Sequence, residues 1–77
     1  MMALPERPWL GARVRQLREE GAISQQELAE RAQVSLSTVS RLEQTSWPVR
    51  GSTIRKLARA LGVQPKDLAR QHRDGAD

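Results

Sequence analysis

The feature that most constrains this chain is the short distance between two helical patterns in its centre. Residues 24–32 and 36–44 both show the apolar spacing of an amphipathic helix, and only residues 33–35 separate them. A connection this short prevents two helices from lying antiparallel side by side, so they must cross at a steep angle. Ala29 and Ala32 supply the small side chains that such a crossing needs, and Val34 is expected to fill the turn.

Apolar residues at helical spacing predict three more helices. The first begins near Pro8 and ends before Gly21. The next is capped by Ser52 and ends at Gly62, where a helix C-terminus favours a left-handed residue; a short last helix begins at Pro65. No segment alternates with period two over enough residues to form a strand. The predicted fold class is therefore all-α, a bundle of five short helices.

Serine residues mark the starts of the two central helices. Ser24 is followed by Glu27 three residues later, which predicts a capping box, and Ser35 is placed to cap the next helix. The inward residues of that next helix are expected to be Val39 and Leu42, at i and i+3. The side chains left on its outer face are Leu36, Ser37, Thr38, Ser40 and Arg41.

This outer face carries compact polar side chains where an ordinary solvated helix would carry glutamate and lysine. Serine and threonine are poor helix formers that gain nothing on a bare surface. A DNA major groove, in contrast, admits a helix whose exposed side chains are short. Ser37 and Thr38 can bond to base edges, Arg41 can make a bidentate contact with guanine, and Leu36 can pack on a thymine methyl. Two alternatives stay open, namely a phosphate contact for Arg41 and partial burial for Leu36.

Composition excludes several classes of function. The 77 residues are expected to form one domain, with a polar tail over residues 70–77. There is no cysteine and the one histidine, His72, lies in the tail, so we expect neither a metal site nor a cofactor. No carboxylate pair lies in an apolar setting that would shift a pKa, which argues against an enzyme. The apolar runs are too short to span a bilayer and the N-terminus lacks the order of a signal peptide, which predicts a cytoplasmic protein.

Positive charge is concentrated in the second half of the chain. There are 13 Lys+Arg and 9 Asp+Glu, for a net charge of +4. Between residues 35 and 66 the only acid is Glu43, and the cations there are Arg41, Arg50, Arg55, Lys56, Arg59 and Lys66. A one-sided binding face for a polyanion requires such a distribution. The run Arg55, Lys56 and Arg59 is nevertheless expected to be a solvated face.

Residues 10–68 resemble the helix-turn-helix domains of the phage repressor and Cro family, the xenobiotic-response-element class of bacterial regulators. The resemblance rests on three stretches, LGARVRQLREE, ISQQELAERAQVSLSTVSRLEQ and STIRKLARALGVQPKDL. It implies a compact five-helix bundle of the lambda repressor-like type, with the helix-turn-helix at residues 24–44. It also implies that the third helix reads the major groove of double-stranded DNA and that the protein binds as a two-fold dimer.

The resemblance implies roles for individual residues. Base contacts fall on Leu36, Ser37, Thr38 and Arg41, and Arg18 pairs with Glu43 in a structural ion pair. The expected phosphate contacts are Gln25, Gln26, Ser35, Ser40, Trp47, Arg50, Ser52 and Thr53. For Trp47 three alternatives stay open: packing on sugar-phosphate, on a dimer partner or on the core. Trp9 is expected to cover the core beside the first helix.

The chain departs from the family pattern at two positions. Gln33 stands in the turn where the family usually has glycine, so a non-glycine residue is expected to hold a positive φ at a cost of about 1 kcal/mol. Gln44 and Thr45 follow Glu43, where glycine is common, which leaves the path of the next loop open.

The combined features predict a sequence-specific DNA-binding transcriptional regulator, a repressor that binds a partly palindromic operator as a homodimer. The sequence does not determine the dimer surface, for which the region around Leu68 is the candidate. An antitoxin, which would also bind a toxin, or the controller of a restriction–modification operon would use the same fold. A different alternative is a protein-interaction module that has kept the bundle and lost DNA binding.

Overall fold

The computed structural model describes residues 9–45 and 49–69, and within these ranges it is helical without strands. Five helices follow one another: α1 (Leu10–Glu20), α2 (Gln25–Ala32), α3 (Leu36–Thr45), α4 (Gly51–Leu61) and α5 (Pro65–Ala69). The all-α fold class and the number of helices are thus confirmed. The expected start of the first helix at Pro8, the side chain of Trp47 and the polar tail at residues 70–77 lie outside the described residues.

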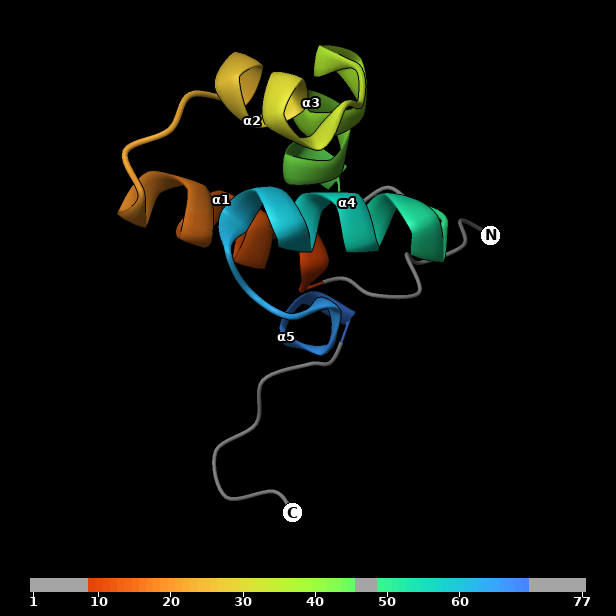
Figure 1. Ribbon diagram of the computed structural model, residues 1–77. Coiled ribbons are helices and arrows are strands. Elements are labelled where there is room, and N and C mark those ends of the chain that lie inside the picture. Colours follow the sequence, from red (N-terminus) through yellow and green to blue (C-terminus); the bar gives the residue numbers. More distant parts are fainter. Residues whose placement is uncertain (1–8, 46–48, 70–77) are drawn as a thin grey trace.

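Helices α1 and α4 form the middle of the molecule. In Figure 1, α2 and α3 lie on one side of these two helices and α5 lies on the other. Helix α1 contacts α3 and α5, α4 contacts α2 and α5, and α1 and α4 also contact one another. The α2–α3 pair is therefore carried on a platform, with the outer side of α3 turned away from it.

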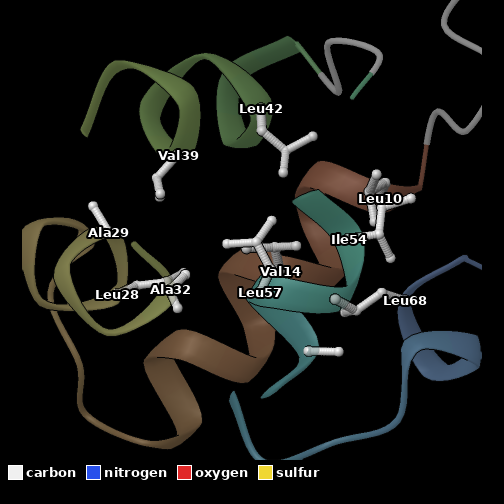
Figure 2. Close-up of a cluster of buried hydrophobic side chains, with 11 residues drawn as sticks. Leu10, Val14, Leu28, Ala29, Ala32, Val39, Leu42, Ile54, Leu57 and Leu68 are labelled. Carbon is white, nitrogen blue, oxygen red and sulfur yellow. The ribbon is translucent and has the colours of Figure 1, made fainter. Parts of the chain in front are cut away.

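The core is built without phenylalanine or tyrosine, because the chain has neither. Every helix contributes at least one aliphatic side chain to a single cluster, and Figure 2 shows these side chains meeting between the helices. The buried members are Leu10, Val14, Leu28, Ala29, Ala32, Val39, Leu42, Ile54, Leu57, Ala58 and Leu68. Leu17, Val34 and Leu61 pack against the edge of this cluster and are only partly buried.

Leu68 is fully buried, at 0 % exposure, although the dimer surface was expected around it. Its side chain completes the core below α4, so it is not available to a second copy. The short helix that carries it is held in place by this one apolar contact site and by its own cap, in which the Gln64 N–H donates to Asp67 Oδ2 at 3.0 Å.

The crossing of α2 and α3 depends on small side chains, as predicted. Ala29 and Ala32 are only 4 % and 3 % exposed, and α2 packs on α3. Val39 and Leu42 approach from α3 and are completely buried (Figure 2). A longer side chain at either alanine would separate the two helices and tilt the outer face of α3.

Three helices end with the same pattern of backbone hydrogen bonds. A left-handed residue follows each helix: Ala22 (φ 57°) after α1, Gln33 (φ 59°) after α2 and Gly62 (φ 75°) after α4. Two N–H groups then return to carbonyls in the last turn of the helix, at 3.0–3.2 Å. The positive φ at Gln33 is confirmed. The first helix ends before Gly21, as predicted, and Gly21 has a φ of −88°. The left-handed Ala22 was not predicted.

The serine caps of α2 and α3 are present. The Glu27 N–H donates to Ser24 Oγ at 3.0 Å and the Ser24 N–H donates to Glu27 Oε1 at 3.4 Å, which is the predicted capping box. At the start of α3, the Thr38 N–H donates to Ser35 Oγ at 3.0 Å. Each cap satisfies one of the N–H groups that a helix start leaves without an intrahelical partner.

The predicted cap at Ser52 is wrong. Helix α4 begins at Gly51, and the N-cap is Arg50, which has an extended backbone (φ −71°, ψ 157°). The Arg50 carbonyl accepts hydrogen bonds from the N–H groups of Thr53 and Ile54, at 3.0 and 3.1 Å. Ser52 is therefore the second residue of the helix and is exposed. The side chain of this N-cap residue does not cap α4, because arginine has no acceptor to offer.

The left-handed residues provide a test of backbone strain. Ala22→Gly and Gln33→Gly should each raise the free energy of unfolding by about 0.5 kcal/mol, because relief of a left-handed β-carbon exceeds the extra entropy of glycine in the unfolded chain. The matched control is Ala12→Gly, an exposed position inside α1, which should lower it by up to about 1 kcal/mol. Urea denaturation followed by circular dichroism measures all three. A loss of stability in both Ala22→Gly and Gln33→Gly would contradict the strain.

Candidate nucleic-acid interface

The outer face of α3 is fixed by the burial of its inner face. Because Val39 and Leu42 point into the core, Ser37 and Arg41 are left exposed, and Thr38 and Ser40 are half-buried at the border. Leu36 is 47 % exposed, the highest value among the large hydrophobic side chains that the structure describes. The expected alternative of partial burial for Leu36 is thus not what the structure shows.

The hydroxyl groups in the first turn of α3 are held by one another. Ser35 Oγ and Thr38 Oγ1 lie 2.8 Å apart, close enough for either hydroxyl to donate to the other. Ser35 Oγ also accepts the Thr38 N–H. These bonds fix both side chains before any ligand arrives, so the edge of the helix presents a rigid hydroxyl pair beside the exposed Ser37.

A buried carboxylate anchors α3 to the rest of the bundle. The side chain of Glu43 is only 3 % exposed. It accepts two hydrogen bonds from Arg18, from Nε to Oε2 at 2.8 Å and from Nη2 to Oε1 at 3.0 Å. Arg18 Nη1 donates in addition to the Ile23 carbonyl at 2.8 Å. The ion pair implied by the family resemblance is present, and it joins the last turn of α1, the α1–α2 turn and α3.

Glu43 affects the ionisation of its partner. The hydrogen bond and the charge of this carboxylate raise the pKa of the Arg18 guanidinium, and the burial of the guanidinium opposes them. Because the pKa of Arg18 is raised in the folded state, its charge stabilises the fold at pH values below the ordinary pKa of arginine. This stabilisation is lost only as the pH rises through the pKa of the folded state. Arg18 therefore stays charged throughout the pH range in which proteins are usually studied.

The start of α2 lies against the same carboxylate. Gln25 is half-buried and its Nε2 donates to Glu43 Oε1 at 3.0 Å. Gln26, the next residue, is exposed. The backbone N–H groups of these two residues precede the first N–H that an intrahelical carbonyl accepts, that of Leu28. They are oriented outward at the positive end of the helix dipole, which favours an anion.

The start of α4 is electrostatically unbalanced. Its N-cap residue, Arg50, provides no side-chain cap, and its first turn contains no acid, although the positive end of a helix favours both. Arg50 and Ser52 are exposed and Thr53 is half-buried. Arg55 leans back toward this end, since a β-carbon built on Gly51 would lie 3.5 Å from Arg55 Nη1. An added anion would compensate this concentration of positive charge.

Among the described residues, exposed arginines on α1 and α2 pair with acids, whereas the exposed cations on α4 do not. On α1, Arg15 pairs with Glu19 at 3.0 Å, and on α2, Arg31 pairs with Glu27 at 3.2 Å. The three cations along α4 are exposed, and within the described residues none of them forms an ion pair with an acid; they are Arg55, Lys56 and Arg59. The positive charge of these three residues is therefore left for solvent or for a partner.

Comparison with known proteins identifies the family. The family model of the helix-turn-helix domain matches residues 9–71, most of the chain. The chain belongs to this helix-turn-helix family. A search of curated proteins finds no match.

Solved structures of this family share the fold of the chain. A hypothetical transcription factor from Neisseria is 33 % identical, with 88 % of this chain and 83 % of that one aligned and a TM-score of 0.75. The restriction-modification controller protein C.AhdI from Aeromonas hydrophila is also 33 % identical, covering 82 % of this chain and 96 % of its own, with a TM-score of 0.76. The N-terminal DNA-binding domain of SinR from Bacillus subtilis is 28 % identical, covering 86 % and 97 %, with a TM-score of 0.79.

These matches establish the class of protein. The helix-turn-helix family and its solved members are DNA-binding transcription regulators of the phage repressor and Cro type, as the sequence resemblance implied, and they are not enzymes. SinR has also been solved in a complex with the SinI protein. In the parts of this chain that the structure describes, no helix is long and apolar enough to cross a membrane, and no three acids or histidines gather as metal ligands.

Two hydrogen bonds behind this face were not predicted from the sequence. The bond between Gln25 and Glu43 joins residues 18 positions apart, and Gln25 was considered only as a phosphate contact. No local pattern could have revealed the bond, because a glutamine at a helix start does not specify a partner 18 residues away. The hydrogen bond from Arg18 to the Ile23 carbonyl was missed for the same reason.

The buried bridge should dominate the stability of the α2–α3 pair. Arg18→Ala leaves the Glu43 carboxylate buried without its cation and should lower the free energy of unfolding by about 3 kcal/mol. Arg15→Ala is the matched control: it removes another α1 arginine, whose pair is 63 % and 55 % exposed, and should change it by less than about 0.5 kcal/mol. Thermal melts of both variants measure the contrast. Equal melting temperatures for Arg18→Ala and the parent would refute the anchoring role.

Proposed function

We propose that this protein is a sequence-specific transcriptional repressor that places α3 in the DNA major groove. The observation that carries the proposal is the exposed α3 face of short side chains, fixed on a rigid platform by the Glu43 bridge. A groove admits a helix most deeply where its side chains are compact. The proposed base contacts are Leu36, Ser37, Thr38 and Arg41.

Phosphate contacts are proposed on both sides of this face. The start of α2 offers outward N–H groups beside Gln25 and Gln26, and the uncapped start of α4 offers a positive dipole end beside Arg50. Both features favour the anionic DNA backbone and fix the register of α3 in the groove. The full proposed set is Gln25, Gln26, Ser35, Ser40, Trp47, Arg50, Ser52 and Thr53.

The operator is proposed to be partly palindromic and bound by a homodimer. Two-fold symmetry would place the two α3 helices about 34 Å apart, one turn of B-DNA. Each protomer would then read one half-site with the same side chains. Because the Leu68 side chain is buried, the proposed dimer contact uses exposed residues around α5 rather than Leu68 itself.

A second candidate within DNA binding is the control of a restriction–modification operon. The observation that favours it is the similarity to C.AhdI, a restriction-modification controller aligned over 96 % of its length at 33 % identity. Such a controller would bind DNA through the same face. A restriction or methyltransferase gene beside the gene for this protein would favour the controller; a toxin gene there, with a stable complex between the two products, would favour an antitoxin.

Selection from randomised duplex DNA tests the proposal directly. The expected winner has two half-sites related by a dyad, with centres about 10 base pairs apart. Its affinity should fall steeply with salt, by about 0.9 log units of affinity per log unit of salt for each phosphate neutralised. Failure to enrich any sequence at any salt concentration would overturn sequence-specific binding and favour a protein-interaction module.

Arg41 provides the sharpest test of the reading face. Arg41→Ala should weaken binding to the selected site by about 1–3 kcal/mol and relax the preference at one base pair, because a bidentate contact to guanine is lost. Arg59→Ala, another exposed arginine on the solvated face of α4, is the matched control and should leave base preference unchanged. Competition binding against all single-base variants of the site measures both. Equal weakening on cognate and random DNA by Arg41→Ala would make Arg41 a phosphate contact.

A further inference from the structure

The side chain of Gln25 does more in the structure than a phosphate contact requires. It is the first residue of α2, and its half-buried amide is turned toward α3 rather than fully into solvent. Its Nε2 donates to Glu43 Oε1 at 3.0 Å. Gln26, one residue later, is exposed and has no such bond among the described residues. The two glutamines at the start of α2 are therefore not equivalent.

The acceptor of this bond is the carboxylate that holds α3. Oε1 of Glu43 accepts from both Arg18 Nη2 and Gln25 Nε2, at 3.0 Å each, while Oε2 accepts from Arg18 Nε at 2.8 Å. With a side chain only 3 % exposed, Glu43 has little access to water as a substitute donor. The Gln25 amide is thus one of three bonds on which the position of this carboxylate depends.

The position of Glu43 in turn sets the angle of the reading face. Glu43 follows Leu36 by seven residues, two helical turns, so it lies on the same side of α3 as this proposed base contact. A displaced carboxylate would rotate or slide this side of the helix relative to the platform of α1 and α4. Base contacts need side chains within a few tenths of an ångström of their partners, whereas phosphate contacts tolerate more movement.

The remaining amide proton gives Gln25 a second use. The nitrogen of a glutamine amide carries two N–H groups, and Glu43 takes one of them. The other lies at the start of α2, where the backbone N–H groups also favour an anion. One nitrogen can therefore bridge a DNA phosphate and the Glu43 carboxylate.

We propose that Gln25 is a positioning residue, which acts through Glu43 to align the base-reading side of α3 when the start of α2 meets a phosphate. The proposal rests on the proposed function and adds to it a determinant of specificity that touches no base. A plain phosphate contact contributes equally to all DNA sequences. A positioning residue contributes more to the affinity for the cognate sequence, because only on that sequence does correct alignment of α3 form the base contacts.

The test compares three variants on two DNA duplexes, the selected site and a scrambled sequence of equal length. Gln25→Met keeps the length of the side chain and removes its donor; Gln25→Lys restores a donor to Glu43; Gln26→Met is the matched control. Binding is measured at a temperature where circular dichroism shows every protein folded. Gln25→Met should lower affinity for the selected site about ten-fold more than for the scrambled duplex. Gln26→Met should lower both by the same factor, and Gln25→Lys should keep the parental ratio.

Equal losses on both duplexes for Gln25→Met would reduce Gln25 to a phosphate contact and overturn the proposal. The free protein gives an independent arm, the NMR signal of the Arg18 Nε–H, which donates to the same carboxylate. This signal should shift in Gln25→Met and not in Gln26→Met; no shift in either would also overturn the proposal. A parent that prefers no sequence would instead sink the proposed function, and with it any role of Gln25 in specificity, even if the Arg18 signal shifts.

Discussion

The arrangement of this protein depends on one buried carboxylate. An uncompensated charge in the interior costs several kcal/mol, so Glu43 can be 3 % exposed only if its donors are in place. Those donors come from the end of α1 and the start of α2, through Arg18 and Gln25. Satisfying the charge therefore requires three helices to reach their native positions together. The apolar core supplies most of the driving force for collapse, and the carboxylate selects one arrangement of α3 from those that would bury the same aliphatic surface.

The core allows small shifts of its helices, because it contains no phenylalanine or tyrosine and consists of aliphatic side chains on short helices. Such a core makes steep helix crossings easy, since Ala29 and Ala32 let α2 and α3 approach closely. It also leaves little surplus stability. The two left-handed non-glycine residues, Ala22 and Gln33, show that tight turns are kept here despite the strain of a β-carbon. Both turns border α2, which places the start of that helix beside Glu43.

Local features of the fold could be predicted from the sequence because local chemistry determines them. The capping box at Ser24 and the inward positions of Val39 and Leu42 follow from spacing alone. The predicted start of α4 was wrong. Serine is a common N-cap residue, which suggested Ser52, but the residue with the extended backbone of an N-cap is Arg50. The outer face of α3 was predicted by excluding the inner positions. The hydrogen bonds that hold α3 in place were not predicted from periodicity. The Gln25–Glu43 bond joins residues distant in the sequence, and the Arg18–Glu43 pair was expected only through the family resemblance.

The hydroxyl pair at the edge of α3 has a consequence for how a binding site could change over time. Ser35 Oγ and Thr38 Oγ1 lie 2.8 Å apart and either can be the donor. When Ser35 donates, the proton of Thr38 is left to point outward; when Thr38 donates, Thr38 presents only lone pairs. Reversing this hydrogen bond, by rotation of the two hydroxyl protons, therefore exchanges a donor for an acceptor without moving a heavy atom. An edge of this kind can accommodate an adenine amino group or a guanine carbonyl. If Thr38 makes the proposed base contact, the bound sequence can therefore change at that base pair while the protein sequence stays the same.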